Sequence, residues 1–423
     1  MKIETKKLKS GLRLAVCNMK GLEGVSFKIF VFTGSSNETK ECDYGISHLI
    51  EHMFFKGTKN RSSFEISKEF DKNGIQTNAY TSKECTCFFT YGTNDSLDKS
   101  VEIMSDLFFN SSYDKKELES EKQVVIEEIK MYQDRPDAVC DIMLENIFYD
   151  KTTYAHDIAG TEESVSNITR EQILDYISKH YLPSNIVLAF AGNVTIKEAE
   201  ELTQKYFESK FDKNFYEEKI AFPSDFSIDK KQIIVRKDTQ QALINIGYKM
   251  ENRYSSKRYH YSIISQILGG TMSSRLFQEV REKKGLVYNI STFSDLNELT
   301  GLFSISLGTT PTKVNLALKT IKDVLDDVVK NGVTLEELNQ AKKMIISALK
   351  LSKDSPSNQA TKIASQLKYF GKIISTQESI ETYQKITLEE VNNTIKELFE
   401  NKNYCICMVN DKLDIDLVEA FEK

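Results

Sequence analysis

Short runs of apolar residues along the chain predict β-strands. Residues 186–191 and 404–409 are almost wholly apolar, and residues 233–235 are β-branched. Residues 301–307 partly alternate polar and apolar side chains, as strands of antiparallel sheets do. The chain is therefore expected to contain sheets as well as helices.

A long helix is predicted over residues 115–133. Asp114 and Glu117 open it with the spacing of a capping box. On a helical wheel, three apolar residues lie within about 40° of Leu118 and complete a buried stripe. These residues are Val125, Ile129 and Tyr132. Glu127 lies about 180° away from the stripe and is expected to face solvent.

The second half of the chain repeats the plan of the first half at a shift of about 220 residues. Glu117, Leu118 and Lys122 match Glu337, Leu338 and Lys342, and residues 168–171 resemble residues 386–389. Each copy is predicted to contain strands, a first helix, a long helix and a final strand. The fold class is therefore α+β, with two tandem homologous domains, each an antiparallel-rich sheet with helices packed on one face.

The predicted domains are residues 1–215 and 228–423. The charged segment 216–227, which contains Pro223, is the predicted linker. A chain of 423 residues is long enough for two cores of this size.

Composition and charge exclude several classes of protein. The net charge is −6 without a basic stripe, so no nucleic-acid partner is expected. No apolar stretch approaches 18 residues, and no apolar segment follows the charged N-terminus, so neither a membrane span nor a signal peptide is expected. The seven cysteines include no C-x-x-C pair and indicate reduced thiols. We therefore expect a cytoplasmic protein. The Lys-, Asn- and Ile-rich composition suggests that it comes from a bacterium.

Two of the five histidines lie in one short motif, His48-Leu49-Ile50-Glu51-His52. On a helix, the two imidazoles and the carboxylate fall within an arc of roughly 100°. Two imidazoles one turn apart can bind one zinc ion, and the carboxylate can act as a base. The order H-x-x-E-H is that of the inverzincin metallopeptidases. The alternative is a helix that carries two solvated histidines.

The long helix offers two candidates for a third zinc ligand. Glu121 and Glu128 both lie beside its apolar stripe, where a carboxylate is costly unless it is paired or binds a cation. In the second copy, alanines stand at both positions, Ala341 and Ala348. The positions of His48, Glu51 and His52 are taken there by Tyr261, Ile264 and Ser265. All candidate zinc residues thus lie in the first copy, and the wheel leaves Glu121 and Glu128 open.

The runs GISHLIEHMFFKGT at residues 45–58 and EKQVVIEEI at residues 121–129 resemble the M16 (pitrilysin and mitochondrial processing peptidase-like) zinc metallopeptidases. The resemblance covers nearly the whole chain and implies the LuxS/MPP-like metallohydrolase fold. It implies that His48, His52 and Glu128 bind one zinc ion per chain. Glu121 then matches an acid of the family that orients the site without touching the metal.

The resemblance also implies substrate-binding residues in both copies. Residues 78–88 resemble an edge strand that holds substrate, with Asn78 and Ala79 at contact positions. Residues 273–288 resemble a stretch whose Arg281 and Tyr288 contact substrate. A guanidinium and a phenol can donate to a substrate carbonyl or stabilise the oxyanion. The alternatives are an ordinary sheet strand, a solvated Arg281 and a Tyr288 buried in a strand core.

The implied activity is that of a zinc metalloendopeptidase that cuts peptides or unfolded protein segments, with Glu51 as the general base. The resemblance implies that chains of about this length close in pairs around a chamber. Because this chain carries both the zinc residues and the Arg281–Tyr288 pair, a homodimer is expected. A heterodimer with a metal-free relative is the second possibility. The alternative function is a non-catalytic or regulatory metal-binding subunit of such a heterodimer. The sequence does not identify the substrate or the cleavage preference.

Overall fold

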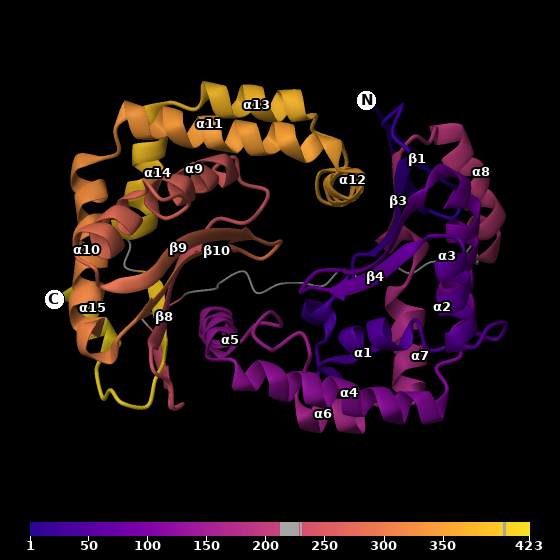
Figure 1. Cartoon of the computed structure of the whole chain (residues 1–423), viewed down its shortest axis with the longest axis horizontal. Coiled ribbons are helices and arrows are strands. Elements are labelled where there is room, and N and C mark those ends of the chain that lie inside the picture. Colours follow the sequence, from indigo (N-terminus) through magenta and orange to yellow (C-terminus); the bar gives the residue numbers. More distant parts are fainter. Residues whose placement is uncertain (212–227, 229–230, 401–402) are drawn as a thin grey trace. The chain divides into compact units, whose positions relative to one another are not determined.

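The computed structural model describes residues 1–211, 228, 231–400 and 403–423. The predicted linker, residues 216–227, lies outside the described residues. The chain forms two compact units. Unit 1 contains Met1–Lys130, His156–Ala221 and Leu351–Ile374, and unit 2 contains Met131–Ala155, Phe222–Lys350 and Ser375–Lys423. Each unit is built around one sheet (Figure 1).

In the part of the chain that the structure describes, the sheet of unit 1 has six strands in the order β1-β2-β6-β3-β5-β4, and β2 with β6 is its one parallel pair. Its strands are β1 (Lys2–Lys7), β2 (Arg13–Asn18), β3 (Gly24–Val31), β4 (Gln76–Thr81), β5 (Thr86–Thr93) and β6 (Ile186–Gly192). Phe27, Ile29, Leu188 and Phe190 point to one face and pack into the main core of this unit.

The sheet of unit 2 has five strands in the order β7-β11-β8-β10-β9, with β7 and β11 parallel and the other pairs antiparallel. Its strands are β7 (Lys231–Val235), β8 (Ala242–Met250), β9 (Val287–Leu296), β10 (Gly301–Thr309) and β11 (Tyr404–Val409). This order repeats the order β2-β6-β3-β5-β4 of unit 1. The structure therefore confirms the α+β class and the two homologous, antiparallel-rich sheets.

Helices cover the main core face of each sheet. Around the first sheet lie α1 (Ile46–Met53), α2 (Ser63–Lys72), α3 (Leu97–Asn110), α4 (Lys115–Asp134), α6 (Glu162–Asn167), α7 (Arg170–His180) and α8 (Ile196–Tyr206). Around the second lie α9 (Arg258–Leu268), α10 (Val314–Asn331), α11 (Leu335–Leu351), α13 (Thr376–Lys385), α14 (Leu388–Glu400) and α15 (Leu417–Glu422). A π-helical segment, Phe277–Lys283, precedes β9.

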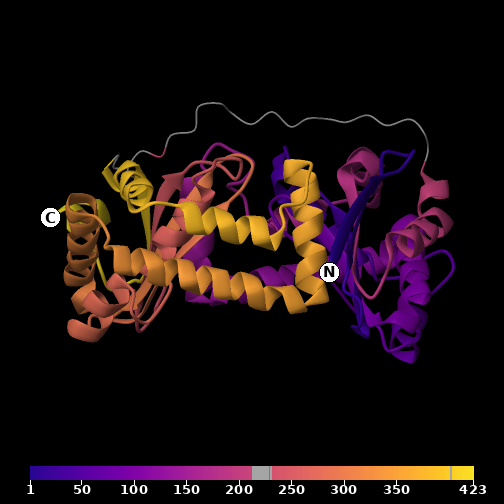
Figure 2. The ribbon, with the colours of Figure 1, turned by 90° about the horizontal axis from the view of Figure 1, so that it is seen from above.

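The opposite face of each sheet is covered by one helix from the other half of the sequence. In unit 1, α12 (Pro356–Phe370) packs against β2, β3 and β6 (Figure 1, Figure 2). Lys28 Nζ on β3 donates to Thr361 Oγ1 of this helix at 3.0 Å. In unit 2, α5 (Pro136–Phe148) packs against β7, β8 and β11. The two helices hold the same place in the repeat, so the halves exchange equivalent elements. The predicted contiguous domains did not include this exchange.

The long helix forms where the apolar pattern predicted it, as α4. Asp114 Oδ1 accepts the N–H groups of Lys116 (2.9 Å) and Glu117 (3.2 Å), which are donors of the first turn. The stripe packs into the core, with Leu118, Val125 and Ile129 at most 5% exposed. Among the described helices, none combines the length and apolarity that a membrane span requires.

Candidate metal centre

Helix α1 has two chemically different sides. Its apolar residues are spaced three and four apart and are at most 1% exposed: Ile46, Leu49, Ile50 and Met53. Because these residues anchor the helix in the core, His48, Glu51 and His52 are directed to the other side. The rings of the two histidines lie 4.6 Å apart, centroid to centroid.

Helix α4 brings two carboxylates to the same place. Glu121 and Glu128 are seven residues apart, so they lie two turns apart on nearly the same side of the helix. Glu121 is only 5% exposed, whereas Glu128 is partly exposed. The Glu127 side chain is 72% exposed and pairs with Lys130, as the wheel predicted for the solvent side.

His48, His52 and Glu128 form a compact group. Glu128 Oε2 lies 3.4 Å from His52 Nε2 and 3.8 Å from His48 Nε2. One ligand atom from each of the three residues lies within 4.8 Å of the others. The wheel left Glu121 and Glu128 open, but in the structure it is Glu128 that faces the Nε2 atoms of both rings.

Glu121 instead holds the far side of one ring. Its Oε2 lies 3.2 Å from His52 Nδ1, and its Oε1 pairs with Lys56 Nζ at 2.5 Å. Although burial raises the pKa of Glu121, the hydrogen bonds from His52 and Lys56 lower it overall. The carboxylate therefore stays ionised and fixes the ring so that Nε2 points to Glu128.

The charges around the histidines favour a cation. Burial lowers the pKa of His48 to about 4, so this ring is a neutral ligand. Burial also lowers the pKa of His52, but Glu121 and Glu128 outweigh it and raise that pKa to about 9. The raised pKa means that the two carboxylates beside His52 stabilise a positive charge at this position. A bound metal cation would replace the proton on His52.

The donor set fits zinc. Two imidazole nitrogens and one carboxylate oxygen are the three protein ligands of a catalytic zinc site, which keeps a further position open for water. Nε2 of His48 is the nitrogen that lies 3.8 Å from Glu128, and within the described residues Nδ1 of the same ring is buried without a hydrogen-bond partner. His48, His52 and Glu128 would hold the ion.

Glu51 lies on the same side of α1 and is tied to the neighbouring strand. Thr81 Oγ1, at the end of β4, donates to Glu51 Oε2 at 2.8 Å. Burial raises the pKa of Glu51, and the hydrogen bond from Thr81 only partly opposes this. A carboxyl group whose pKa is raised above its usual value is suited to general acid–base chemistry.

Strand β4 forms an edge of the first sheet, because in the strand order it has β5 as its one neighbour. Its exposure alternates along the strand, with Asn78 exposed and Ala79 half-buried. The backbone N–H of Ala79 donates to Asn78 Oδ1 at 2.8 Å. An edge strand next to Glu51 can accept an extended polypeptide as an added strand.

Arg281 and Tyr288 belong to unit 2. Arg281 lies on the π-helical segment, and its guanidinium stacks 4.6 Å from the ring centre of Phe277. It also lies 6.0 Å from the ring centre of Tyr288. Tyr288, on the edge strand β9, is 75% exposed, so it is not a residue of the strand core. The unit therefore brings a guanidinium and a phenol together on its surface.

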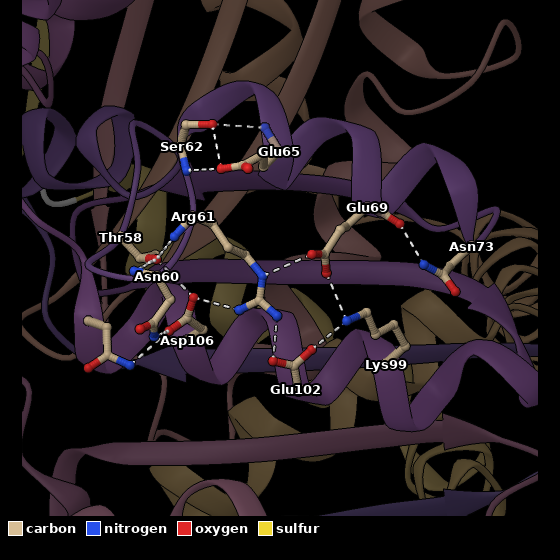
Figure 3. Close-up of polar contacts among 11 residues, drawn as sticks. Thr58, Asn60, Arg61, Ser62, Glu65, Glu69, Asn73, Lys99, Glu102 and Asp106 are labelled. Atoms are coloured by element: carbon tan, nitrogen blue, oxygen red, sulfur yellow. Dashed lines mark hydrogen bonds and ion pairs between the residues drawn. The ribbon is translucent and has the colours of Figure 1, made fainter.

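A charged network fixes the turn that follows α1 (Figure 3). The Arg61 guanidinium pairs with Asp106 (2.6 Å), Glu102 (2.6 Å) and Glu69 (3.2 Å). Asp106 is 4% exposed and also accepts from Thr58 Oγ1 at 2.9 Å. The network joins the turn to α2 and α3.

The same turn is bonded to the segment that enters α4. Lys59 N–H donates to Asn110 O at 3.0 Å, and Ser112 N–H donates to Gly57 O at 3.1 Å. The helix with the histidines and the helix with Glu128 are thus joined by a short, hydrogen-bonded path.

Sequence reasoning missed Lys56 and Thr81. Both stand inside stretches that carry the resemblance, and a search for polar residues next to the motif would have found them. Their contacts with Glu121 and Glu51 depend on the packing of α1 against α4 and β4, which no local pattern encodes.

Two family descriptions match the chain. Residues 15–162 match “Insulinase (Peptidase family M16)”, and residues 167–345 match “Peptidase M16 inactive domain”. The first match includes His48, His52 and Glu128, and the second includes Arg281 and Tyr288.

Solved structures share the fold. A protease from Helicobacter pylori has a TM-score of 0.90 at 24% identity, covering 97% of this chain and 99% of its own. A structure described as the peptidase M16 inactive domain from Pseudomonas fluorescens has a TM-score of 0.90 at 20% identity, covering 98% and 100%.

Sequence relatives extend over nearly the full length. The “Uncharacterized zinc protease YmxG” of Bacillus subtilis (strain 168) is 33% identical over 404 residues, 95% of this chain and 96% of the relative. An “Uncharacterized zinc protease” of Rickettsia felis is 31% identical over 402 residues, 93% and 94% of the two chains. With this identity over almost its whole length, the chain belongs to peptidase family M16.

Proposed function

We propose that the protein is a zinc-dependent endopeptidase of the inverzincin class. The observation that carries the proposal is the convergence of His48, His52 and Glu128, with Glu51 beside them on α1. Bound there, zinc would supply a Lewis acid that activates water and polarises the scissile carbonyl. The names of the relatives as zinc proteases support the same chemistry.

The residues around the metal centre have separate tasks. Glu51 takes the proton of the attacking water and returns it to the leaving amine. Because Thr81 donates to Oε2, we assign the proton to Oε1. Strand β4 holds the substrate through backbone hydrogen bonds near Asn78 and Ala79, which places little demand on its side chains. Peptides and unfolded segments, which can become extended, are therefore the substrate class.

Arg281 and Tyr288 are proposed to contact the substrate carbonyl from unit 2, where both can donate hydrogen bonds. The proposed assembly is a homodimer that encloses the substrate. The alternative is a heterodimer with a metal-free relative, and the molar mass of the purified protein distinguishes the two. The cytoplasmic location stays a prediction.

Digestion of a library of unstructured peptides tests the activity. The protein is expected to cut the peptides, to stop when a chelator removes the metal, and to recover when zinc is restored. Glu51→Gln should keep zinc and lower kcat by about 10²- to 10⁴-fold. A protein that binds one zinc per chain and cuts no peptide would favour the non-catalytic or regulatory subunit. A fully active Glu51→Gln variant would refute the assigned base.

A further inference from the structure

The first turn of α1 is capped by a residue from outside the helix. Gly45 begins the helix with φ +89° and has no side chain to cap it. Glu38, seven residues earlier and 0% exposed, accepts the N–H of Gly45 at Oε2 and the N–H of Ser47 at Oε1, both at 2.9 Å. Its oxygens lie at the positive end of the helix dipole, and burial raises the pKa of the carboxyl.

His156 completes this cap. Its Nε2 lies 3.0 Å from Glu38 Oε2, and its side chain is 8% exposed. The imidazole stacks on the Tyr44 ring, with centroids 3.8 Å apart and planes 5° apart. Two backbone N–H groups and one imidazole nitrogen therefore surround the buried carboxyl group, and the imidazole comes from a distant part of the chain.

Backbone contacts hold His156 in place. A Cβ at Gly160, where φ is +76°, would lie 2.4 Å from the carbonyl oxygen of Tyr44. A Cβ at Gly45 would lie 2.5 Å from the carbonyl oxygen of Ala159. The two segments therefore touch through their backbones, and Ser164 Oγ adds a hydrogen bond to Tyr44 O at 2.7 Å. The turn that carries His156 has little freedom to move away from Glu38.

A buried carboxylate is a costly way to cap a helix, since an exposed Ser, Thr or Asp would satisfy the same N–H groups. Helix α1 has only eight residues, and isolated helices of this length are marginal. Yet it carries two metal ligands and the proposed base. His48 directly follows Ser47, whose N–H is fixed by Glu38.

We propose that Glu38 and His156 act together as positioning residues for α1 and thereby set the zinc affinity of the site. The inference rests on the proposed zinc function. The pair holds the first turn so that His48 and Glu51 leave the helix toward Glu128. Neither residue belongs to the candidate ligand set of His48, His52 and Glu128.

Zinc affinity, measured by competition with a chromophoric chelator, tests the proposal. Glu38→Gln replaces one acceptor oxygen with an NH2 group, which repels the N–H group that it faces. The variant should weaken zinc binding about 10- to 100-fold. His156→Leu should weaken it similarly, whereas His156→Gln, which keeps a donor, should recover most of the affinity. Because the residues act as a unit, the double variant Glu38→Gln/His156→Leu should be little worse than the worse single variant.

Glu337→Gln is the matched control. Glu337 is also a carboxylate that accepts a backbone N–H at a helix start, that of Thr334 at 2.7 Å, but it lies in unit 2. The Glu337→Gln variant should lower the thermal stability of the metal-free protein without changing its zinc affinity. Wild-type zinc affinity in Glu38→Gln, or an equal loss in Glu337→Gln, would overturn the positioning role. If wild type itself binds no zinc, the proposed function fails instead.

Discussion

Glu121 Oε2 lies 3.2 Å from Nδ1 of His52, on the side of the ring opposite to the nitrogen that faces Glu128. One imidazole is thus held between two carboxylates from the same helix. The carboxylate on the metal side can bind the ion, and the other can only orient the ring and strengthen it as a ligand. The two glutamates therefore predict different effects when they are replaced.

Glu121→Gln should lower zinc affinity about 10- to 100-fold and leave a weakly bound ion. Glu128→Gln should lose the ion altogether, because the site then has only two strong protein ligands. Metal content after dialysis against graded chelator measures both. Glu127→Gln, on the exposed side of α4, is the control and should behave as wild type. The reverse order, with Glu128→Gln keeping more zinc than Glu121→Gln, would exchange their roles.

The pair of Arg275 and Glu337 should make unit 2 sensitive to acid. Burial raises the pKa of Glu337, but the Arg275 guanidinium and Thr334 outweigh it and lower the pKa to about 2. In the unfolded chain, the pKa of a glutamate is about 4.3. The ionised carboxylate therefore stabilises the fold above about pH 4, and this contribution is lost as pH falls toward about 2.

Urea unfolding at several pH values measures this effect. Wild type should be more stable than Glu337→Gln at pH 7, and the gap in the free energy of unfolding should shrink between about pH 4 and about pH 2. A gap that stays constant over this range would show that ionisation of Glu337 does not stabilise the protein.

Arg281 and Tyr288 should affect catalysis and not zinc binding. Both are surface residues of unit 2, so Tyr288→Phe and Arg281→Met should fold normally and keep the metal. If they donate to the substrate carbonyl, each variant should lower kcat by about 10²-fold. Steady-state kinetics on one cleaved peptide measures the loss. Ser291→Ala, which changes an exposed residue on the same strand as Tyr288, is the control. An equal loss of kcat in this variant would contradict a specific role of Arg281 and Tyr288.

The proposed homodimer predicts that activity depends on protein concentration. Light scattering of the purified protein should give twice the mass of the 48.4 kDa chain. Dilution below the dimer dissociation constant should reduce the specific activity, because association follows mass action. An active protein that is strictly monomeric at every concentration would contradict the enclosed dimer.

Local patterns were enough to predict the parts of the fold that depend on periodicity. The stripe through Leu118, Val125 and Ile129 placed α4 almost to the residue, since a buried helix face must repeat every three to four positions. The motif from His48 to His52 predicted a shared helix side for the same reason. The sequence repeat alone did not predict the order of the strands, and the structure shows that both sheets share one order.

Position along a helix axis is harder to predict than the side of the helix. Glu121 and Glu128 differ by only about 20° on the wheel but by about 10.5 Å along α4. Which one meets the histidines depends on how far α1 lies along α4, and the family spacing supplied that information. Glu38 could not be predicted at all, because it stands in an irregular segment and its partners at Gly45, Ser47 and His156 are brought to it by tertiary packing.

The exchange of α5 and α12 has a consequence for synthesis of the chain. The face of the first sheet formed by Ala15, Cys17 and Phe30 packs against Ala360 and Ile363, which are synthesised more than 300 residues later. Until then, a nascent N-terminal half exposes an apolar sheet face that, among the described residues, α12 covers in the folded chain, and exposed faces of this kind are prone to aggregation. Folding of the half that carries His48 and His52 is thus tied to synthesis of the second half of the repeat.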